Sequence, residues 1–184
     1  PIDTEPWTVT EQTADALTVA ADFSLVNWSD HRFDLSVERR IELLDREQVE
    51  ALLGLPLPEG SRFVAYQTRN TVTNTGDEAW TPETGLLSIW LLGMYHPSPE
   101  TVVFIPYRND LGADAGPVVN DAYFGPVAAD RLRAEDGLIL FRADGASRGK
   151  IGLPPERSLG LAGGYDPAAG RFTLIQYDRP ETVG

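Results

Sequence analysis

Aromatic rings, amides and basic side chains that could together bind a sugar are the residues of this sequence that point most directly to chemistry. The rings that could line such a site are Trp28, Trp80, Trp90, Tyr95, Tyr107 and Tyr123. The amides and basic residues are Asn70, Asn74, Asn120, Arg39, Arg69, Arg148 and Lys150. Aromatic faces stack on the apolar side of a pyranose ring, and amides and guanidinium groups hydrogen-bond to its hydroxyls. Any one of these rings could instead fill the core or an edge of the fold.

Lys150 is unusual because the chain holds fourteen arginines and this one lysine. An ammonium group on a flexible stem is suited to a narrow pocket in which a guanidinium fork does not fit. Gly149 and Gly152 would let the backbone approach a ligand there. The alternative is a surface lysine in a chain with a general bias toward arginine. We expect Lys150 to donate to a sugar hydroxyl or an acidic group.

Several other kinds of chemistry have no support in the residues. The two histidines, His31 and His96, are too few for a multi-histidine metal site, so we expect no metal and no cofactor. A Gly-rich phosphate loop leading from a strand into a helix is absent. Neither Ser88 nor Ser98 has a nearby base in the sequence that would make it a nucleophile, so no serine hydrolase is indicated.

Length and charge limit the class of protein. The 184 residues suit one domain, which we expect to span residues 1–184. A net charge of −13 argues against binding to nucleic acid or to an anionic membrane. The chain begins at Pro1 without a methionine, so we expect either a removed leader or a piece of a longer protein. Both the cytoplasm and export remain open, as does the oligomeric state.

The first elements that could position these residues form a hairpin. Apolar residues alternate over residues 17–25 and again over 33–41, separated by the turn formers of residues 27–30. Arg39 falls on the apolar phase, so its side chain should point into the core or a cavity and hydrogen-bond there. A short helix is predicted over residues 45–53, with Asp45 as its N-cap and Gly54 at its end.

The most apolar stretch is residues 86–95, which carries no charge on either phase of a strand. This pattern predicts a central strand covered on both faces, between strands at residues 68–75 and 101–105. A membrane helix would need about 18 or more apolar residues. We therefore expect a β-meander around this segment.

Beyond the meander, a loop over residues 107–130 is followed by predicted strands at 137–142, 158–165 and 171–178. A loop this long in a compact domain is usually functional, although it could be a solvated connection. The residues suited to a site wall are Tyr107, Arg108, Asn120, Asp121, Tyr123 and Phe124. Strands without alternating helices predict an all-β, antiparallel β-sandwich with one short helix.

Four stretches carry a resemblance to a known family: VAYQTRNTVTNTGDEAW, GLLSIWLLGMYHPSPETVVFIPY, FRADGASRGKIGL and GGYDPAAGRFTLIQYDRP. Over these, from about Leu35 onward, the chain resembles an uncharacterised bacterial family related to the aldose 1-epimerases, also called galactose mutarotases. The resemblance implies a galactose-mutarotase-like β-supersandwich and a sugar ligand. It also makes His96 the match for the histidine that protonates the sugar ring oxygen in those enzymes.

Three functions follow as hypotheses. The first is a carbohydrate-binding or carbohydrate-processing protein, with its ligand on a concave face. Its site would combine His96 as the catalytic residue with the substrate-binding residues Arg39, Arg69, Asn74, Trp90, Arg148 and Lys150. The second is a structural or assembly module without a small-molecule site. The third is a true aldose 1-epimerase, so whether the chain is an enzyme stays open.

Overall fold

The computed structural model describes residues 4–179 and divides the chain into two compact units, Pro1–Leu92 and Gly93–Gly184. Each unit contains one antiparallel sheet. The described residues form nine strands, one α-helix and one short 3₁₀ turn. The all-β, antiparallel class with one short helix that the sequence predicts is confirmed.

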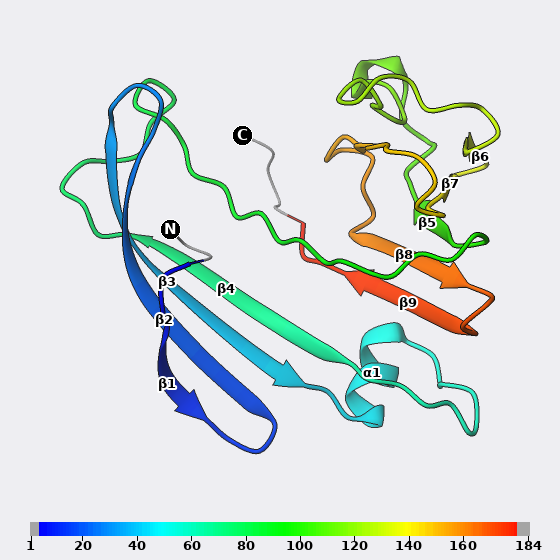
Figure 1. Ribbon diagram of the computed structural model, residues 1–184, viewed down its shortest axis with the longest axis horizontal. Helices are drawn as coiled ribbons and strands as arrows, with labels where there is room; N and C mark the ends of the chain where they lie inside the picture. Colours follow the sequence, from blue (N-terminus) through cyan, green and yellow to red (C-terminus); the bar gives the residue numbers. More distant parts are fainter. Residues whose placement is uncertain (1–3, 180–184) are drawn as a thin grey trace. The chain divides into compact units, whose positions relative to one another are not determined.

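The first unit holds a four-stranded sheet in the order β1-β2-β3-β4 (Figure 1). Its strands are β1 (Thr8–Gln12), β2 (Ala16–Val26), β3 (Arg32–Leu43) and β4 (Tyr66–Asn74). The predicted hairpin is confirmed as β2 and β3. Its turn is held by Asn27, whose side-chain oxygen accepts hydrogen bonds from the backbone N–H groups of Ser29 and His31. Asp30 takes the left-handed conformation that the turn requires, with φ of 59°.

The core of this sheet lies on one face, because side chains alternate along each strand. Phe23 on β2 pairs with Leu35 on β3, and Val37 pairs with Val72 on β4. Trp7, Trp80 and Leu87 pack against these buried side chains. The opposite face carries the acidic and hydroxyl residues, so the sheet is strongly two-sided.

The predicted helix is α1 (Arg46–Leu53), which follows β3. The Asp45 side chain accepts from the backbone N–H of Gln48, and the Gln48 side chain accepts from the backbone N–H of Asp45. This reciprocal capping box fixes where the helix begins. Gly54, with φ of 68°, ends it in the left-handed conformation.

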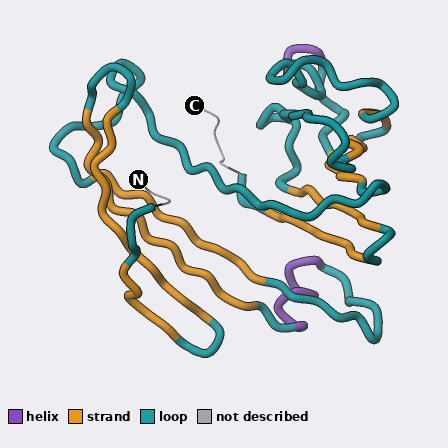
Figure 2. The backbone as a smooth tube through the Cα atoms, in the orientation of Figure 1, coloured by secondary structure: helices purple, strands orange, loops and turns teal. Residues whose placement is uncertain are grey.

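The predicted central strand at residues 86–95 is wrong. This segment forms no strand, and its backbone makes no hydrogen bond within residues 4–179. Figure 2 shows it as part of a long loop path between β4 and β5. Most of its large side chains are exposed, with Trp90 at 80%. The β-meander is wrong as well, because β4 pairs with β3 and β5 pairs with β7 and β8.

The second unit holds a five-stranded sheet in the order β6-β7-β5-β8-β9. Its strands are β5 (Val102–Pro106), β6 (Leu132–Glu135), β7 (Leu138–Arg142), β8 (Leu161–Asp166) and β9 (Arg171–Gln176). Ile139 on β7 is almost fully buried, and Phe104 on β5 stacks on Phe172 of β9 at 5.3 Å between centroids. The 3₁₀ turn η1 (Ala113–Ala115) lies in the loop that follows β5.

Within residues 4–179, no helix is long and apolar enough to cross a lipid bilayer.

Candidate functional site

The residues proposed for a sugar site fall in different units of the chain. Arg39, Arg69, Asn74 and Trp90 lie in the first unit, and His96, Arg148 and Lys150 lie in the second.

Arg39 occupies the position predicted for it, on the core face of β3. Its neighbours across the sheet are Val19 on β2 and Asn70 on β4. The side chain is half-buried, and its Nε atom is buried without a hydrogen-bond partner within residues 4–179. The acceptors expected for this guanidinium, a carboxylate included, are not found in the described part of the chain. Arg39 is therefore a charge on an otherwise uncharged stretch of the sheet face.

The other three residues of the first unit do not converge on Arg39. Arg69 pairs with Arg40, which lies on the opposite face of the sheet, and is exposed. The amide of Asn74 closes a turn, since its Nδ2 donates to the carbonyl of Glu78 at 2.7 Å and its Oδ1 accepts from the backbone of Gly76 at 3.0 Å. Trp90 lies on the exposed segment 86–95.

His96 lies in the second unit, on irregular backbone before β5. Its side chain is exposed and has no hydrogen-bond or ion-pair partner within residues 4–179. The structure therefore shows no carboxylate or hydroxyl that orients this imidazole.

Arg148 and Lys150 do come together, against two aromatic residues of the long loop. The Lys150 Nζ atom lies 4.0 Å from the centroid of the Tyr123 ring, and the Arg148 Cζ atom lies 4.1 Å from that of Phe124. The two rings meet edge to face, with centroids 4.6 Å apart. We call these four residues the basic–aromatic cluster. Each cation covers one face of a ring, a favourable electrostatic contact.

A cavity of about 380 Å³ lies beside the cluster. Its lining residues are Asn120, Ala122, Tyr123, Lys150 and Gly152. Asn120 and Tyr123 are two of the loop residues that the sequence indicates for a site wall. The loop and the lone lysine, which the sequence singles out separately, thus belong to one site.

Backbone pairing between distant segments creates this arrangement. Asn120 and Gly152 exchange two backbone hydrogen bonds, of 2.9 and 2.7 Å, which hold the segment of Lys150 against the loop. The Asp121 carboxylate then accepts from the backbone N–H of Val127 at 2.8 Å and closes the turn that displays Tyr123. Gly152 therefore brings the backbone close to Asn120, whereas the sequence predicts a close approach to a ligand.

Arg157 fixes the first half of the same loop, a role that the sequence analysis misses. Its side chain is buried, at 5% exposure, and within residues 4–179 all of its hydrogen bonds go to backbone carbonyls. The acceptors are the carbonyl oxygens of Arg108, Leu111, Gly112 and Gly116. One guanidinium thus satisfies several backbone groups that a loop without strands would otherwise leave unpaired.

The Asp144 side chain stabilises the turn that precedes Arg148. Its carboxylate accepts from Arg131 and from the backbone N–H of Ala146, and it lies 3.6 Å from Arg142. The hydrogen bonds from Arg131, followed by that from Ala146, lower the pKa of Asp144 to about 2. The carboxylate is therefore charged throughout the physiological range and holds the turn in place.

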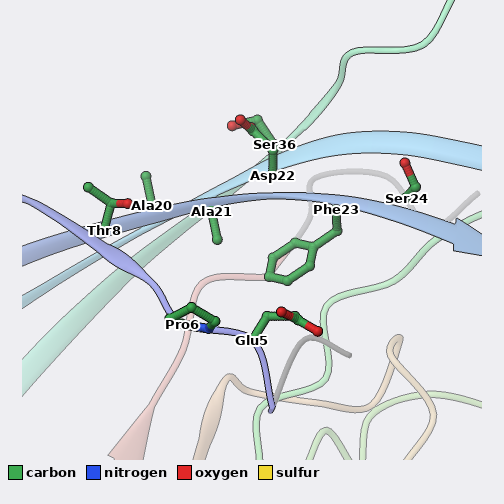
Figure 3. Close-up of a pocket in the computed structure, with 9 residues that line it drawn as sticks. All are labelled: Glu5, Pro6, Thr8, Ala20, Ala21, Asp22, Phe23, Ser24 and Ser36. Atoms are coloured by element: carbon green, nitrogen blue, oxygen red, sulfur yellow. The ribbon is translucent and has the colours of Figure 1, made fainter.

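A second cavity, of about 620 Å³, lies in the first unit beside β2. Figure 3 shows Phe23 on the side of the strand that faces Pro6 and Glu5, with Asp22 on the other side. Its charged lining residues are Glu5 and Asp22, and it contains no basic residue. None of the residues proposed for the sugar site lines it. Two carboxylates and a few hydroxyls, without a histidine or a cation to complement them, give this cavity no evident reaction.

No three His, Asp or Glu side chains among the described residues are grouped so that they could hold a metal ion. The basic–aromatic cluster, with its cavity, is thus the place where predicted site residues meet.

Comparison with known proteins gives one match. The profile of a family described as "Family of unknown function (DUF6786)" matches residues 1–184. No curated protein and no solved structure matches the chain.

Proposed function

The chain belongs to the DUF6786 family of unknown function, and we propose that it binds carbohydrate at the basic–aromatic cluster of its second unit. The observation that supports this is the contact of Lys150 with Tyr123, both of which line the cavity. Tyr123 is 70% exposed, so part of its ring remains available to a pyranose. The cation beside it can donate to a ring hydroxyl.

The polar groups around the cavity suit a polyhydroxylated ligand. Lys150 supplies rotatable N–H donors, and the Asn120 amide nitrogen supplies further ones. Gly152 and Ala122 leave room beside the Tyr123 ring, because neither has a large side chain. A sugar could therefore stack on the aromatic residue and hydrogen-bond at its rim, which is how small polar ligands are oriented in clefts.

A relationship to the aldose 1-epimerases is a further part of the proposal, supported by the sequence resemblance and by the antiparallel sheets. For anomer interconversion, His96 would be the acid, and a carboxylate would have to act as base. His96 has no oriented partner within residues 4–179, so binding has more support in this chain than catalysis. We therefore propose a mutarotase-like fold with a sugar ligand, and treat anomer interconversion as a reaction to be assayed.

Binding is tested by titrating the protein calorimetrically with neutral monosaccharides and oligosaccharides. Loss of the Tyr123 ring in Tyr123→Ala should weaken binding about tenfold, since an aromatic contact contributes about 0.5–1.5 kcal/mol beyond its area. Trp28→Ala is the control, because Trp28 is fully exposed at the tip of the β2–β3 hairpin. Equal weakening by both substitutions, or no binding by the parent, would reject the proposal. An anomer-interconversion assay on the parent and on His96→Ala tests catalysis separately.

A structural or assembly module is the second candidate, and one observation favours it. Residues 86–95 expose a run of large apolar side chains that soluble monomers rarely leave uncovered. Sedimentation of the protein across a range of concentrations tests this candidate. Self-association without any sugar binding would support an assembly role and contradict the carbohydrate proposal.

A further inference from the structure

We propose that the ligand of the basic–aromatic cluster is an acidic saccharide, that is, a sugar ring bearing a carboxylate. This inference rests on the proposed function and adds the charge of the ligand to it. It follows from three properties of the site within residues 4–179: its lining supplies N–H donors, its cations form no ion pair, and its lining contains no acid.

Several acceptors around the cavity already take a hydrogen bond from the protein. The Asn120 side-chain oxygen accepts from the backbone N–H of Ala122 at 3.0 Å. The backbone carbonyls of Asn120 and Gly152 accept from each other's N–H groups. The neighbouring Asp121 carboxylate accepts from the backbone of Val127. Among the lining residues, the Asn120 amide nitrogen and the Lys150 ammonium are N–H donors, and the Tyr123 hydroxyl can donate or accept.

The two cations of the cluster have no carboxylate partner within residues 4–179, unlike five of the arginines in the same unit. Each of five arginines there lies within 4 Å of a carboxylate: Arg108, Arg131, Arg133, Arg142 and Arg171. Arg148 and Lys150 form no ion pair within residues 4–179 and lie over aromatic rings instead. The chain as a whole has 28 acidic residues against 15 basic ones. Two neighbouring uncompensated cations in such a chain form a local anion site.

A neutral sugar would use this site incompletely. Its hydroxyls could accept hydrogen bonds from Lys150. A neutral ligand would not neutralise the positive charges of Lys150 and Arg148, which would remain paired with solvent ions alone. A carboxylate on the ring would form charge-assisted hydrogen bonds, which are roughly twice as strong as neutral ones. The ring itself would still stack against Tyr123. We therefore expect an acidic sugar to bind about tenfold to hundredfold more tightly than its neutral counterpart.

The test compares matched ligands by calorimetric titration of the full chain: galactose with galacturonate, and glucose with glucuronate. Acetate serves as a carboxylate without a sugar ring. The expected result is tighter binding of the uronates, weakened by added salt, with little binding of acetate. Lys150→Gln should weaken galacturonate binding far more than galactose binding, because glutamine can still donate to a hydroxyl but carries no charge. Arg133→Gln, an exposed cation on β6, is the control and should alter neither affinity.

Each other outcome overturns a distinct part of the argument. Equal affinity for galactose and galacturonate would reject the acidic ligand and leave carbohydrate binding standing. Acetate as tight as galacturonate would show an anion site without sugar recognition, and so reject both. Binding of neither sugar class also rejects both. Circular dichroism of Lys150→Gln establishes that the variant is folded, and a preference for uronate that survives in this folded variant would reject the role of Lys150.

Discussion

The side chain of Arg157 donates two hydrogen bonds to one carbonyl oxygen, that of Gly116, from Nε at 3.2 Å and from Nη2 at 3.0 Å. The same guanidinium also donates from Nη2 to the carbonyl of Gly112 at 2.8 Å. A single buried fork therefore sets the path of residues 108–116, and through them the start of the turn that carries Tyr123.

Replacing Arg157 should destabilise the second unit strongly. Arg157→Lys retains the charge but cannot reproduce the planar fork, so buried carbonyls lose their donors. We expect the free energy of unfolding to fall by about 2–4 kcal/mol, measured by chemical denaturation. Arg133→Lys is the matched control at an exposed site and should change it by less than about 0.5 kcal/mol. Indistinguishable denaturation of the two variants would contradict this role.

Gly163 on β8 should tolerate no side chain. A Cβ atom there would lie 2.2 Å from the Phe104 ring and 2.6 Å from the carbonyl of Thr173. Because Phe104 is stacked on Phe172, it has little freedom to move, and Gly163→Ala should cost about 1–3 kcal/mol of stability. Gly164→Ala is the adjacent control, since its nearest neighbour would be Val102 O at an ordinary 3.6 Å. Calorimetric melting of both variants checks the difference, and equal melting temperatures would refute it.

Stability should depend on the ionisation of Asp144 in acid. The pKa of this carboxyl is about 2 in the folded protein, against about 3.9 when unfolded, so its contribution is complete above about pH 4. It is then lost as the pH falls toward the folded value. The melting temperature of Asp144→Asn should lie below that of the parent at pH 6, and the two should converge near pH 2.

Asp136→Asn is the control for this pH profile, because Asp136 is exposed and forms no ion pair within residues 4–179. A constant difference in melting temperature between Asp144→Asn and the parent from pH 6 to pH 2 would contradict this prediction. It would show that the charge of Asp144 does not contribute to stability.

Removing the charge of Arg39 should stabilise the first unit. In the described part of the chain its Nε is buried without a hydrogen-bond partner, and Arg39→Met retains an apolar stem while removing the unsatisfied group. We expect a gain of about 1 kcal/mol on denaturation. Arg40→Met is the comparison on the opposite face, where Arg40 donates to Glu11 at 2.6 Å, and it should lose about 0.5–1 kcal/mol. A loss in Arg39→Met as large as in Arg40→Met would imply a partner for Arg39.

Hydrogen exchange should distinguish the two long irregular segments. Backbone amides of residues 86–95 have no hydrogen-bond acceptor within residues 4–179 and should exchange within the shortest labelling time. The amides of Asn120 and Gly152 donate across their bridge and should be protected. The apolar pattern of residues 86–95, by contrast, predicts a central strand with protected amides. Strong protection there would restore that interpretation.

The parts of the fold that were predicted correctly depend on local signals. The capping box of Asp45 and Gln48 lies within four residues, and the β2–β3 hairpin needs only alternation on both sides of one turn. Residues 86–95 were misassigned because an apolar pattern measures a tendency to be buried but does not identify a pairing strand. Strands β1 and β6 were missed because they are short and polar.

The sequence indicates individual residues of the candidate site but not the contact between them. Lys150 stood out as the only lysine, and Tyr123 as an aromatic residue in a long loop. Their contact depends on the bridge between Asn120 and Gly152, which are far apart in sequence and have no complementary pattern. The sequence does not indicate the role of Arg157, because its partners are backbone carbonyls, which every residue possesses. The one usable hint was that a loop with many turn formers and few strands must find donors for its carbonyls.

The two-sidedness of β3 limits how its length can change. Core side chains such as Leu35 and polar ones such as Glu38 alternate along the strand. Insertion of a single residue would send every later side chain to the other face, placing Arg40 in the interior and Ile41 in water. Insertion of two residues preserves the alternation. Length variants of this strand that still fold should therefore differ from it by even numbers of residues. In the gene, such a change is an insertion or deletion of two codons at once.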